Sequence, residues 1–216
     1  MMKKILIFSL LLATNQFVGQ DKKINFGLKT GLNYSKYFPN QVINGQEISD
    51  YNRKLSYYGG FFVSFKIENK FYFQPELLFS EQGTELLIPS IEITDQNGGI
   101  IGVGDFKANI VDYTIAIPLN FKYKVFNNFF VESGFQFEYI FQTKSIVKED
   151  PLFLVTGNKV PNSDIENGNY DIGSILGLSY SLNNKLSLTF RNYIGFIKRE
   201  NNSKSTITYL GVEYKL

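Results

Sequence analysis

Carboxylate and ammonium side chains recur at alternate positions along most of this chain, and some of these groups could in principle carry out a reaction. The chain contains no histidine and no cysteine, which excludes most hydrolytic triads, most zinc sites and any thiolate nucleophile. The remaining candidates are a general acid–base pair such as Glu132 with Glu138, or a Ser–Lys site near a loop. For the two glutamates, structural ion pairing is the simpler interpretation.

The charged residues of the predicted strands share one parity, with seven basic and six acidic side chains, which are Lys29, Lys66, Lys122, Lys124, Lys144, Arg191, Lys215, Glu76, Asp112, Glu132, Glu138, Asp171 and Glu213. A buried charge is tolerated only when it is paired. The near-balance therefore predicts a network of ion pairs inside the protein. We assign no catalytic, cofactor-binding or metal-binding residue, and we expect no enzymatic activity.

Two loop patterns are weaker signals. The segments predicted to connect strands carry acids that could bind calcium, namely Glu47, Asp50, Glu92, Asp95, Glu149, Asp150, Asp164 and Glu166. A solvated loop is the simpler explanation of these acids. The glycines between Gly98 and Gly104 precede no predicted helix, so they do not form a phosphate-binding loop.

Apolar residues alternate with polar ones with a period of two, which is typical of strands. Eight segments show this alternation: 24–35, 55–67, 71–80, 111–124, 129–142, 170–182, 186–196 and 209–216. Each is long enough for the roughly 9–11 residues of a tilted membrane strand. The sequence thus predicts an all-β fold, an eight-stranded antiparallel up-and-down transmembrane β-barrel.

The connections between these segments alternate in length. Asn-bearing turns at 68–70, 126–128 and 183–185 are short. The links 39–54, 83–107 and 147–168 are long and polar, and 199–204 is shorter. Short turns at one end and long loops at the other are typical of an outer-membrane barrel, with both termini at the short-turn, periplasmic end.

A soluble barrel would place the apolar parity inside. Three features favour a membrane barrel instead. The apolar parity is too crowded with large side chains for a narrow interior, and the polar parity carries many glycines. On the apolar parity, tyrosines mark both ends of the strands: Tyr34, Tyr57, Tyr113, Tyr139 and Tyr170 toward the long loops, and Tyr123, Tyr180 and Tyr214 toward the short turns. Two tyrosine belts around an apolar band are what a bilayer selects.

The N-terminus predicts export. Residues 1–20 combine Lys3 and Lys4 with an apolar run and a polar exit, the pattern of a signal peptide. The barrel domain would then span 21–216. Without Lys3 and Lys4 the 22 basic residues fall to 20, equal to the 20 acidic residues. This neutral balance argues against a nucleic-acid partner.

Three residues conflict with simple strands facing lipid. Pro75 and Pro118 each remove a backbone hydrogen-bond donor within a predicted strand. We expect a β-bulge, or a lumen side chain that contacts the freed carbonyl. Asn192 is polar but falls on the lipid-facing parity.

The chain resembles the PorT-like outer-membrane β-barrel family, small barrels of Gram-negative bacteria. The resemblance covers about residues 21–216 and rests on 31–35, 59–62, 73–83, 113–119 and 211–216. Prolines like Pro75 and Pro118 are part of the family pattern. The C-terminal segment is similar to the signal read by the barrel-assembly machinery, although Leu216 stands where an aromatic residue is commoner. The resemblance implies the fold and, through the family's named member, a link to protein secretion.

We therefore expect an outer membrane protein of structural or binding type. It would act through its long extracellular loops or as a partner in envelope assembly or protein secretion. Expected partners are outer membrane lipid, the barrel-assembly machinery during biogenesis, and a protein at loops 83–107 or 147–168. We expect 83–107 to extend beyond the membrane as a hairpin with an edge open to a partner strand. The alternatives are a lipid-modifying or proteolytic barrel enzyme, or a narrow porin-like channel.

Overall fold

The computed structural model describes residues 24–43, 46–199 and 202–216. The predicted signal peptide, 1–20, lies outside these residues. Ten strands and one short helix are present among them: β1 Ile24–Phe38, β2 Gln41–Ile43, β3 Gln46–Asn52, β4 Lys54–Lys66, β5 Phe71–Thr94, β6 Ile100–Phe126, β7 Phe129–Glu149, α2 Pro151–Thr156, β8 Ser163–Ser181, β9 Leu186–Gly195 and β10 Lys204–Lys215. No helix in this part of the chain is long and apolar enough to cross a membrane, a finding that does not bear on strands.

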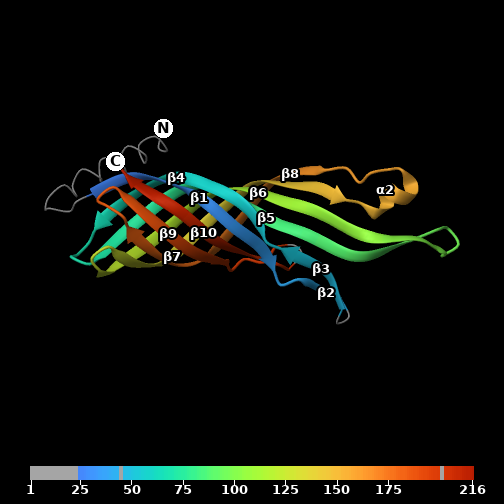
Figure 1. The fold of residues 1–216 in the computed structure, drawn as a ribbon, viewed down its shortest axis with the longest axis horizontal. Coiled ribbons are helices and arrows are strands. Elements are labelled where there is room, and N and C mark those ends of the chain that lie inside the picture. The colour runs from blue at the N-terminus through green and yellow to red at the C-terminus, as the bar shows by residue number, and fades with distance from the viewer. Residues whose placement is uncertain (1–23, 44–45, 200–201) are drawn as a thin grey trace, which may run out of the picture.

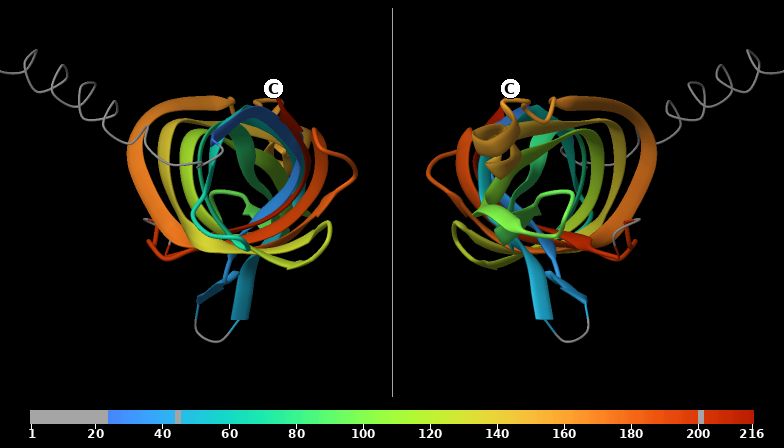
Figure 2. Two further views of the ribbon diagram at one scale, coloured as in Figure 1. Left: turned by 90° about the vertical axis from the view of Figure 1, so that its left-hand side faces the viewer. Right: turned by 90° about the vertical axis from the view of Figure 1, so that its right-hand side faces the viewer.

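Eight of these strands close into a ring, β1-β4-β5-β6-β7-β8-β9-β10, because β5 pairs with both β4 and β6 and β1 pairs with β10. All the pairings are antiparallel. Figure 2 views the ring along its axis, with its wall closed on all sides. β2 and β3 lie outside the ring, where β3 pairs with β5.

The register fixes the tilt of the strands. A line of paired residues that starts at Ile24 of β1 and passes through all the other ring strands returns to β1 at Tyr34, ten residues further along (34 − 24 = 10). Such a stagger in an eight-stranded ring gives tilted strands and an interior just wide enough for side chains to fill.

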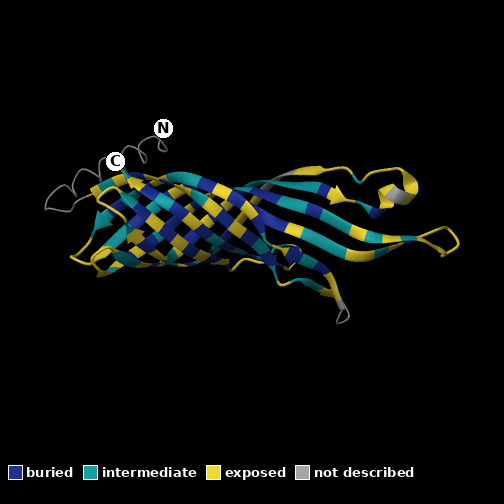
Figure 3. Ribbon diagram, viewed as in Figure 1, coloured by how far each residue is buried: buried dark blue, intermediate teal, exposed yellow. Residues whose placement is uncertain are grey.

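The two faces of the wall follow the predicted parity. Large apolar side chains cover the outward face, and buried polar side chains alternate with them, as the checkerboard in Figure 3 shows. Tyr34, Tyr57 and Tyr170 are exposed near the long-loop end, and Tyr123 and Tyr214 near the short-turn end. The prediction of an apolar outward band with tyrosines at both ends is confirmed.

The two prolines lie where the ladder is interrupted. The β5–β6 pairing includes Pro75 with Leu119 and resumes at Leu78 with Ala116, which skips the position of Pro118. The β4–β5 pairing skips Pro75 between Phe62–Glu76 and Phe65–Phe73. The register is the same on both sides of each gap, so the expected bulge is wrong. A missing N–H here removes a hydrogen bond without inserting a residue.

The wall of the ring continues past its long-loop end as an open sheet (Figure 1). β5 and β6 stay paired as far as Thr94 with Ile100, which confirms the predicted hairpin in 83–107. We use the name extension for β2, β3, α2 and the parts of β5–β8 in 83–110, 143–149 and 163–169.

Two parts of the extension differ from the sequence prediction. The link 39–54 was expected to be a loop, but it contains β2 and β3, so a simple eight-stranded barrel describes the ring and omits these two strands. β3 is polar, with Ser49, Asp50 and Asn52, so its pairing with β5 rather than its own pattern defines it as a strand. The link 147–168 contains the end of β7, α2 and the start of β8.

Helix α2 is short but capped at both ends. The Asp150 side chain accepts a hydrogen bond from the Leu152 N–H, and Gly157 ends the helix with φ 71°. The helix packs on β6, where a Cβ atom on Gly104 would lie 2.8 Å from the Cβ of Pro151. Glycine at this position therefore lets the helix approach the hairpin closely.

Candidate functional site

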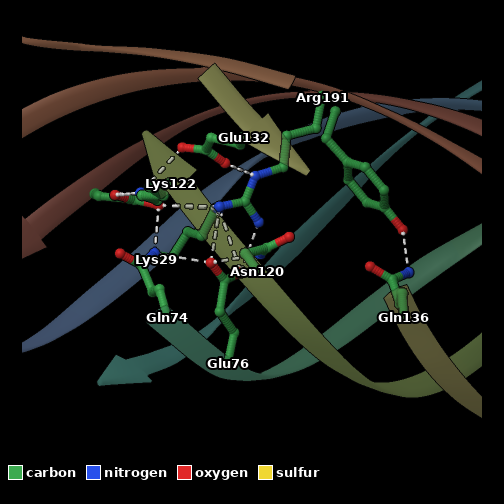
Figure 4. Close-up of polar contacts among 10 residues, drawn as sticks. Lys29, Gln74, Glu76, Asn120, Lys122, Glu132, Gln136 and Arg191 are labelled. Carbon is green, nitrogen blue, oxygen red and sulfur yellow. Dashed lines mark hydrogen bonds and ion pairs between the residues drawn. The ribbon is translucent and has the colours of Figure 1, made fainter. Parts of the chain in front are cut away.

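The interior of the ring contains six charged side chains in mutual contact, which we call the lumen cluster: Lys29, Glu76, Lys122, Glu132, Arg191 and Glu213. Figure 4 shows Arg191 and the two lysines pointing at carboxylates that come from different strands. Arg191 donates to both oxygens of Glu76, at 2.9 and 2.8 Å, and its Nε donates to Glu132. Lys122 lies 2.8 Å from a Glu213 oxygen and 3.0 Å from a Glu132 oxygen.

The lumen cluster is balanced and almost completely buried. Three cations face three carboxylates, and their side chains are between 0 and 7 % exposed. Neutral amides complete the contacts, because Gln74 donates to Glu76 and Glu213, and Asn120 donates to Glu76. Buried charges persist only when they are paired and hydrogen-bonded in this way. The predicted internal ion-pair network is confirmed for these six residues.

An apolar and aromatic layer lies between the lumen cluster and the long-loop end, formed by Tyr58, Leu78, Ala116, Ile175, Tyr193, Ile207 and Tyr209. The rings of Tyr58 and Tyr209 meet edge to face, with centroids 5.0 Å apart. A glycine makes room for one of these rings, because a Cβ atom on Gly173 would lie 2.5 Å from the Tyr193 ring. The layer and the cluster together fill the cross-section of the ring.

The two cavities beside the lumen cluster and the aromatic layer are small. One of about 60 Å³ opens at the short-turn end beside Lys122, Ser179 and Glu213. Another, of about 10 Å³, lies beside Arg191 and Tyr209, which is at the lower limit for a single water. The interior has the character of a packed core.

The carboxylates Glu132 and Glu138 do not form an acid–base pair. They are six residues apart on one strand, so about 20 Å separates their Cα atoms. Glu132 belongs to the lumen cluster, whereas Glu138 accepts hydrogen bonds from Gln82 at 3.0 Å and from Gln136 at 2.6 Å.

The long-loop mouth of the ring has its own ion pair. Arg199, in the β9–β10 connection, lies 2.8 Å from the Asp112 carboxylate and stacks over the Tyr37 ring, 4.2 Å from its centroid. Burial disfavours the charged guanidinium, but the neighbouring Tyr37 and Asp112 outweigh this effect and raise the pKa of Arg199. The alternating pattern did not predict this role for Arg199, because the residue lies outside the alternating segments.

Lys144 was predicted to point into the lumen, and this is wrong. A β-bulge beside Ile140 and Gln142 shifts the β6–β7 register, which reverses the parity of β7 beyond it. Lys144 instead lies 3.5 Å from Asp164 and over the outward ring of Tyr113.

The loop acids have structural contacts in place of a common site. Asp150 caps α2, Glu149 pairs with Lys107 at 2.8 Å, and Asp95 accepts from the backbone N–H groups of Asn97 and Gly99. The ion pair with Glu149 raises the pKa of Lys107. Within 24–43, 46–199 and 202–216, no three acids converge as metal ligands would.

The far end of the extension exposes large apolar side chains, which we call the apolar tip: Ile100, Ile101, Val103, Leu152, Phe153 and Val155. They come from the β5–β6 hairpin and from α2, at the end of the molecule farthest from the ring (Figure 1). No lipid is expected at this distance from the tyrosine belts. An exposed apolar group of this kind commonly marks an interaction site.

Comparison with known proteins gives a consistent result. The family described as outer membrane protein beta-barrel domain matches residues 15–199. Ail, the attachment invasion locus protein of Yersinia pestis, solved with the heparin analogue sucrose octasulfate, is similar with a TM-score of 0.50 and 7% identity, over 90% of this chain and 99% of Ail. Neisserial surface protein A has a TM-score of 0.50 and 11% identity, over 88% of this chain and 97% of that protein. No curated protein matches by sequence.

Proposed function

Because this chain belongs to the outer membrane protein beta-barrel domain family, and is located in the outer membrane, we propose that it is a non-enzymatic binding barrel. Eight strands cross the membrane in this proposal, and the extension projects from the cell surface. The partner is a protein that contacts the apolar tip.

The apolar tip is the observation that carries this proposal. Six large apolar side chains are exposed there, and among them Val155 also packs against Gly102. The hairpin is long, and α2 is held against it by close packing at Gly102 and Gly104. Long ordered connections of this type carry function more often than stability.

The sequence predicted contact through a strand edge, but side-chain contact at the tip fits the extension better. β3 already pairs with β5 at residues 85–87. Beyond them, Pro89 removes a donor, and Ser90 has a φ of 54° at an irregularity between Ile88 and Ile91. Proline and bulges are devices that protect a sheet edge from strand pairing.

The packed interior supports a binding role over a channel. The lumen cluster and the aromatic layer fill the space through which a solute would pass. A finer assignment to the PorT-like group, with a role in secretion or envelope assembly, rests on segments such as 73–83 and 113–119. The identity of the captured partner would decide it.

The test is site-specific photo-cross-linking in intact cells. A photoreactive amino acid replaces Val103 or Phe153 at the tip, and Lys159, an exposed polar position near α2, serves as the control. We expect one discrete protein adduct from both tip positions and none from Lys159. Absence of any tip adduct, or the same adducts from Lys159, would contradict the proposal.

A truncated variant supports the same test. Replacing 89–105 by Asn-Gly keeps the pairing of Leu87 with Lys107 and of β3 with β5. This variant should still assemble, as shown by a mobility on unheated gels that differs from that after boiling, while the adduct from Phe153 is lost. If it fails to assemble, the hairpin serves stability.

A further inference from the structure

One part of the outward face departs from the apolar band. Near the long-loop end, strands β8–β10 carry four polar side chains on that face, which we call the polar strip: Ser174, Asn192, Thr206 and Thr208. The Thr208 hydroxyl donates to the Asn192 side-chain oxygen at 2.8 Å, and the Thr206 hydroxyl donates to the Tyr193 carbonyl at 3.3 Å. This explains how Asn192 can occupy a lipid-facing position.

Three cations lie next to the polar strip on the same face. Lys36 of β1 pairs in register with Thr206, and Lys204 of β10 pairs with Phe38, so the two lysines are diagonal neighbours. Arg53, between β3 and β4, donates to the Tyr34 carbonyl oxygen at 3.1 Å and lies 3.5 Å from the Thr208 hydroxyl. Its guanidinium carbon is 5.3 Å from the centroid of the Tyr34 ring.

None of these three cations has a carboxylate partner among the described residues, and Lys148, Lys159 and Lys198 at this end have none either. Four other cations here are paired: Lys54 with Glu81 at 2.6 Å, Lys107 with Glu149 at 2.8 Å, Lys144 with Asp164 at 3.5 Å, and Arg199 with Asp112 at 2.8 Å. Three unpaired cations on one face attract an external anion.

The position of the three cations along the barrel axis indicates which anion they can meet. Tyr34 belongs to the tyrosine belt at the long-loop end, and such belts lie at the level of the lipid headgroups. Arg53 stacks on this ring, so its guanidinium lies at that level. Lys36 is two residues beyond Tyr34 toward the long-loop end, and Lys204 pairs with Phe38, four residues beyond Tyr34. Phosphate is the headgroup anion that arginine binds in a bidentate way and lysine binds as a point charge.

We propose that Lys36, Arg53 and Lys204 bind the phosphate of a phosphorylated lipid in the outward leaflet of the outer membrane. The hydroxyl or carbonyl groups of the same lipid contact the polar strip below. The lipid is thereby fixed to one side of the ring, across β4, β1 and β10. This site is separate from the apolar tip.

A second copy of the chain is a poorer occupant of this face. A twofold interface would place the same patch on both copies, so three cations would face three cations. Like charges in contact disfavour such an interface. A phosphate neutralises the group instead.

The test measures binding of purified barrel to lipid A, a phosphorylated glycolipid, and to its dephosphorylated form, by native mass spectrometry from neutral detergent. The test variant is K36Q/R53Q/K204Q. The control, K107Q/K148Q/K159Q, removes the same charge from other positions at the long-loop end. Heat-dependent gel mobility establishes that each variant is folded.

We expect wild type and control to bind lipid A and the test variant to bind it roughly a hundredfold more weakly at low salt. Wild type should bind the dephosphorylated form about as weakly as the test variant binds lipid A. Equal binding of the two lipids, equal loss in the control, or a lipid-free dimer that the test variant abolishes would each overturn the proposal.

Discussion

The interior of the ring and the extension differ in whether their side chains are buried and paired or left exposed. Inside the ring, charges of both signs are buried, balanced and hydrogen-bonded to one another. In the extension, large apolar side chains such as Val103 and Phe153 are left in contact with solvent. Every group in the lumen cluster has a charged partner within the chain, whereas the side chains of the apolar tip stay exposed among the described residues. This difference is the basis of our proposal that the ring is a self-sufficient scaffold and that the extension contacts a partner.

The largest expected loss in the free energy of unfolding comes from a substitution in the lumen cluster. Arg191→Met leaves three buried carboxylates facing only Lys29 and Lys122. Breaking a buried pair in this way costs about 3–5 kcal/mol. Urea unfolding of the protein from lipid vesicles should show this loss in the free energy of unfolding.

The matched control is Arg199→Met, at the mouth of the ring, where the arginine side chain is 20% exposed and Asp112 is its one carboxylate partner among the described residues. Its loss should be clearly smaller, because Tyr37 and Thr143 still donate hydrogen bonds to the buried Asp112 carboxylate. Equal losses at the two arginines would show that the cluster is no better isolated from water than the rim.

Substitutions on the outward face should cause the next largest loss of stability. Leu210 is exposed to lipid in the middle of β10, and Thr206 lies four residues nearer the long-loop end on the same face. Leu210→Arg should cost roughly 2–4 kcal/mol, and Thr206→Arg roughly 0–1 kcal/mol, because the cost falls toward the interface. The same vesicle assay measures both, and the reverse order would mean that the depth of β10 is assigned wrongly.

A smaller effect is expected at α2. Asp150→Ala removes the side chain that caps the helix, which typically costs about 1 kcal/mol of local stability. Hydrogen exchange should become faster in α2 while exchange in β9 and β10 is unchanged. Faster exchange throughout the ring would instead tie α2 to global stability.

The smallest effect on stability is expected at the apolar tip. I101S/V103S/F153S should alter the free energy of unfolding by less than about 0.5 kcal/mol per site, since these side chains are exposed. Partner cross-linking should nevertheless be lost. A large loss of stability would mean that the tip side chains pack on the extension itself.

The sequence predicted the scaffold better than the extension, for physical reasons. Lipid outside and a narrow lumen inside impose a strict period of two, so the ring strands, the tyrosine belts and an internal ion-pair network that includes Arg191 could be predicted. Which carboxylates Arg191 contacts could not. Beyond the ring no lipid imposes this pattern, and β3 and α2 depend on contacts with β5 and β6 that local sequence does not show.

Local breaks in the period account for the other differences. The bulge beside Ile140 reversed the parity of Lys144, and nothing in the residue types around it marks the shift. Residue types do not predict the role of Arg199 either. Its pairing with Asp112 joins a connection to a strand residue 87 positions away in the sequence. Parity predicts a face only as long as the register is unbroken.

The central claim is that the ring is a closed scaffold, and single-channel conductance of the purified protein in a planar bilayer tests it most directly. The lumen cluster and the layer of Tyr58, Tyr193 and Tyr209 predict no discrete conductance steps for the wild type at neutral pH, under conditions where heat-dependent gel mobility shows that the barrel is folded. Stable, unitary steps in the wild-type protein would show that ions pass through the lumen and would contradict the account.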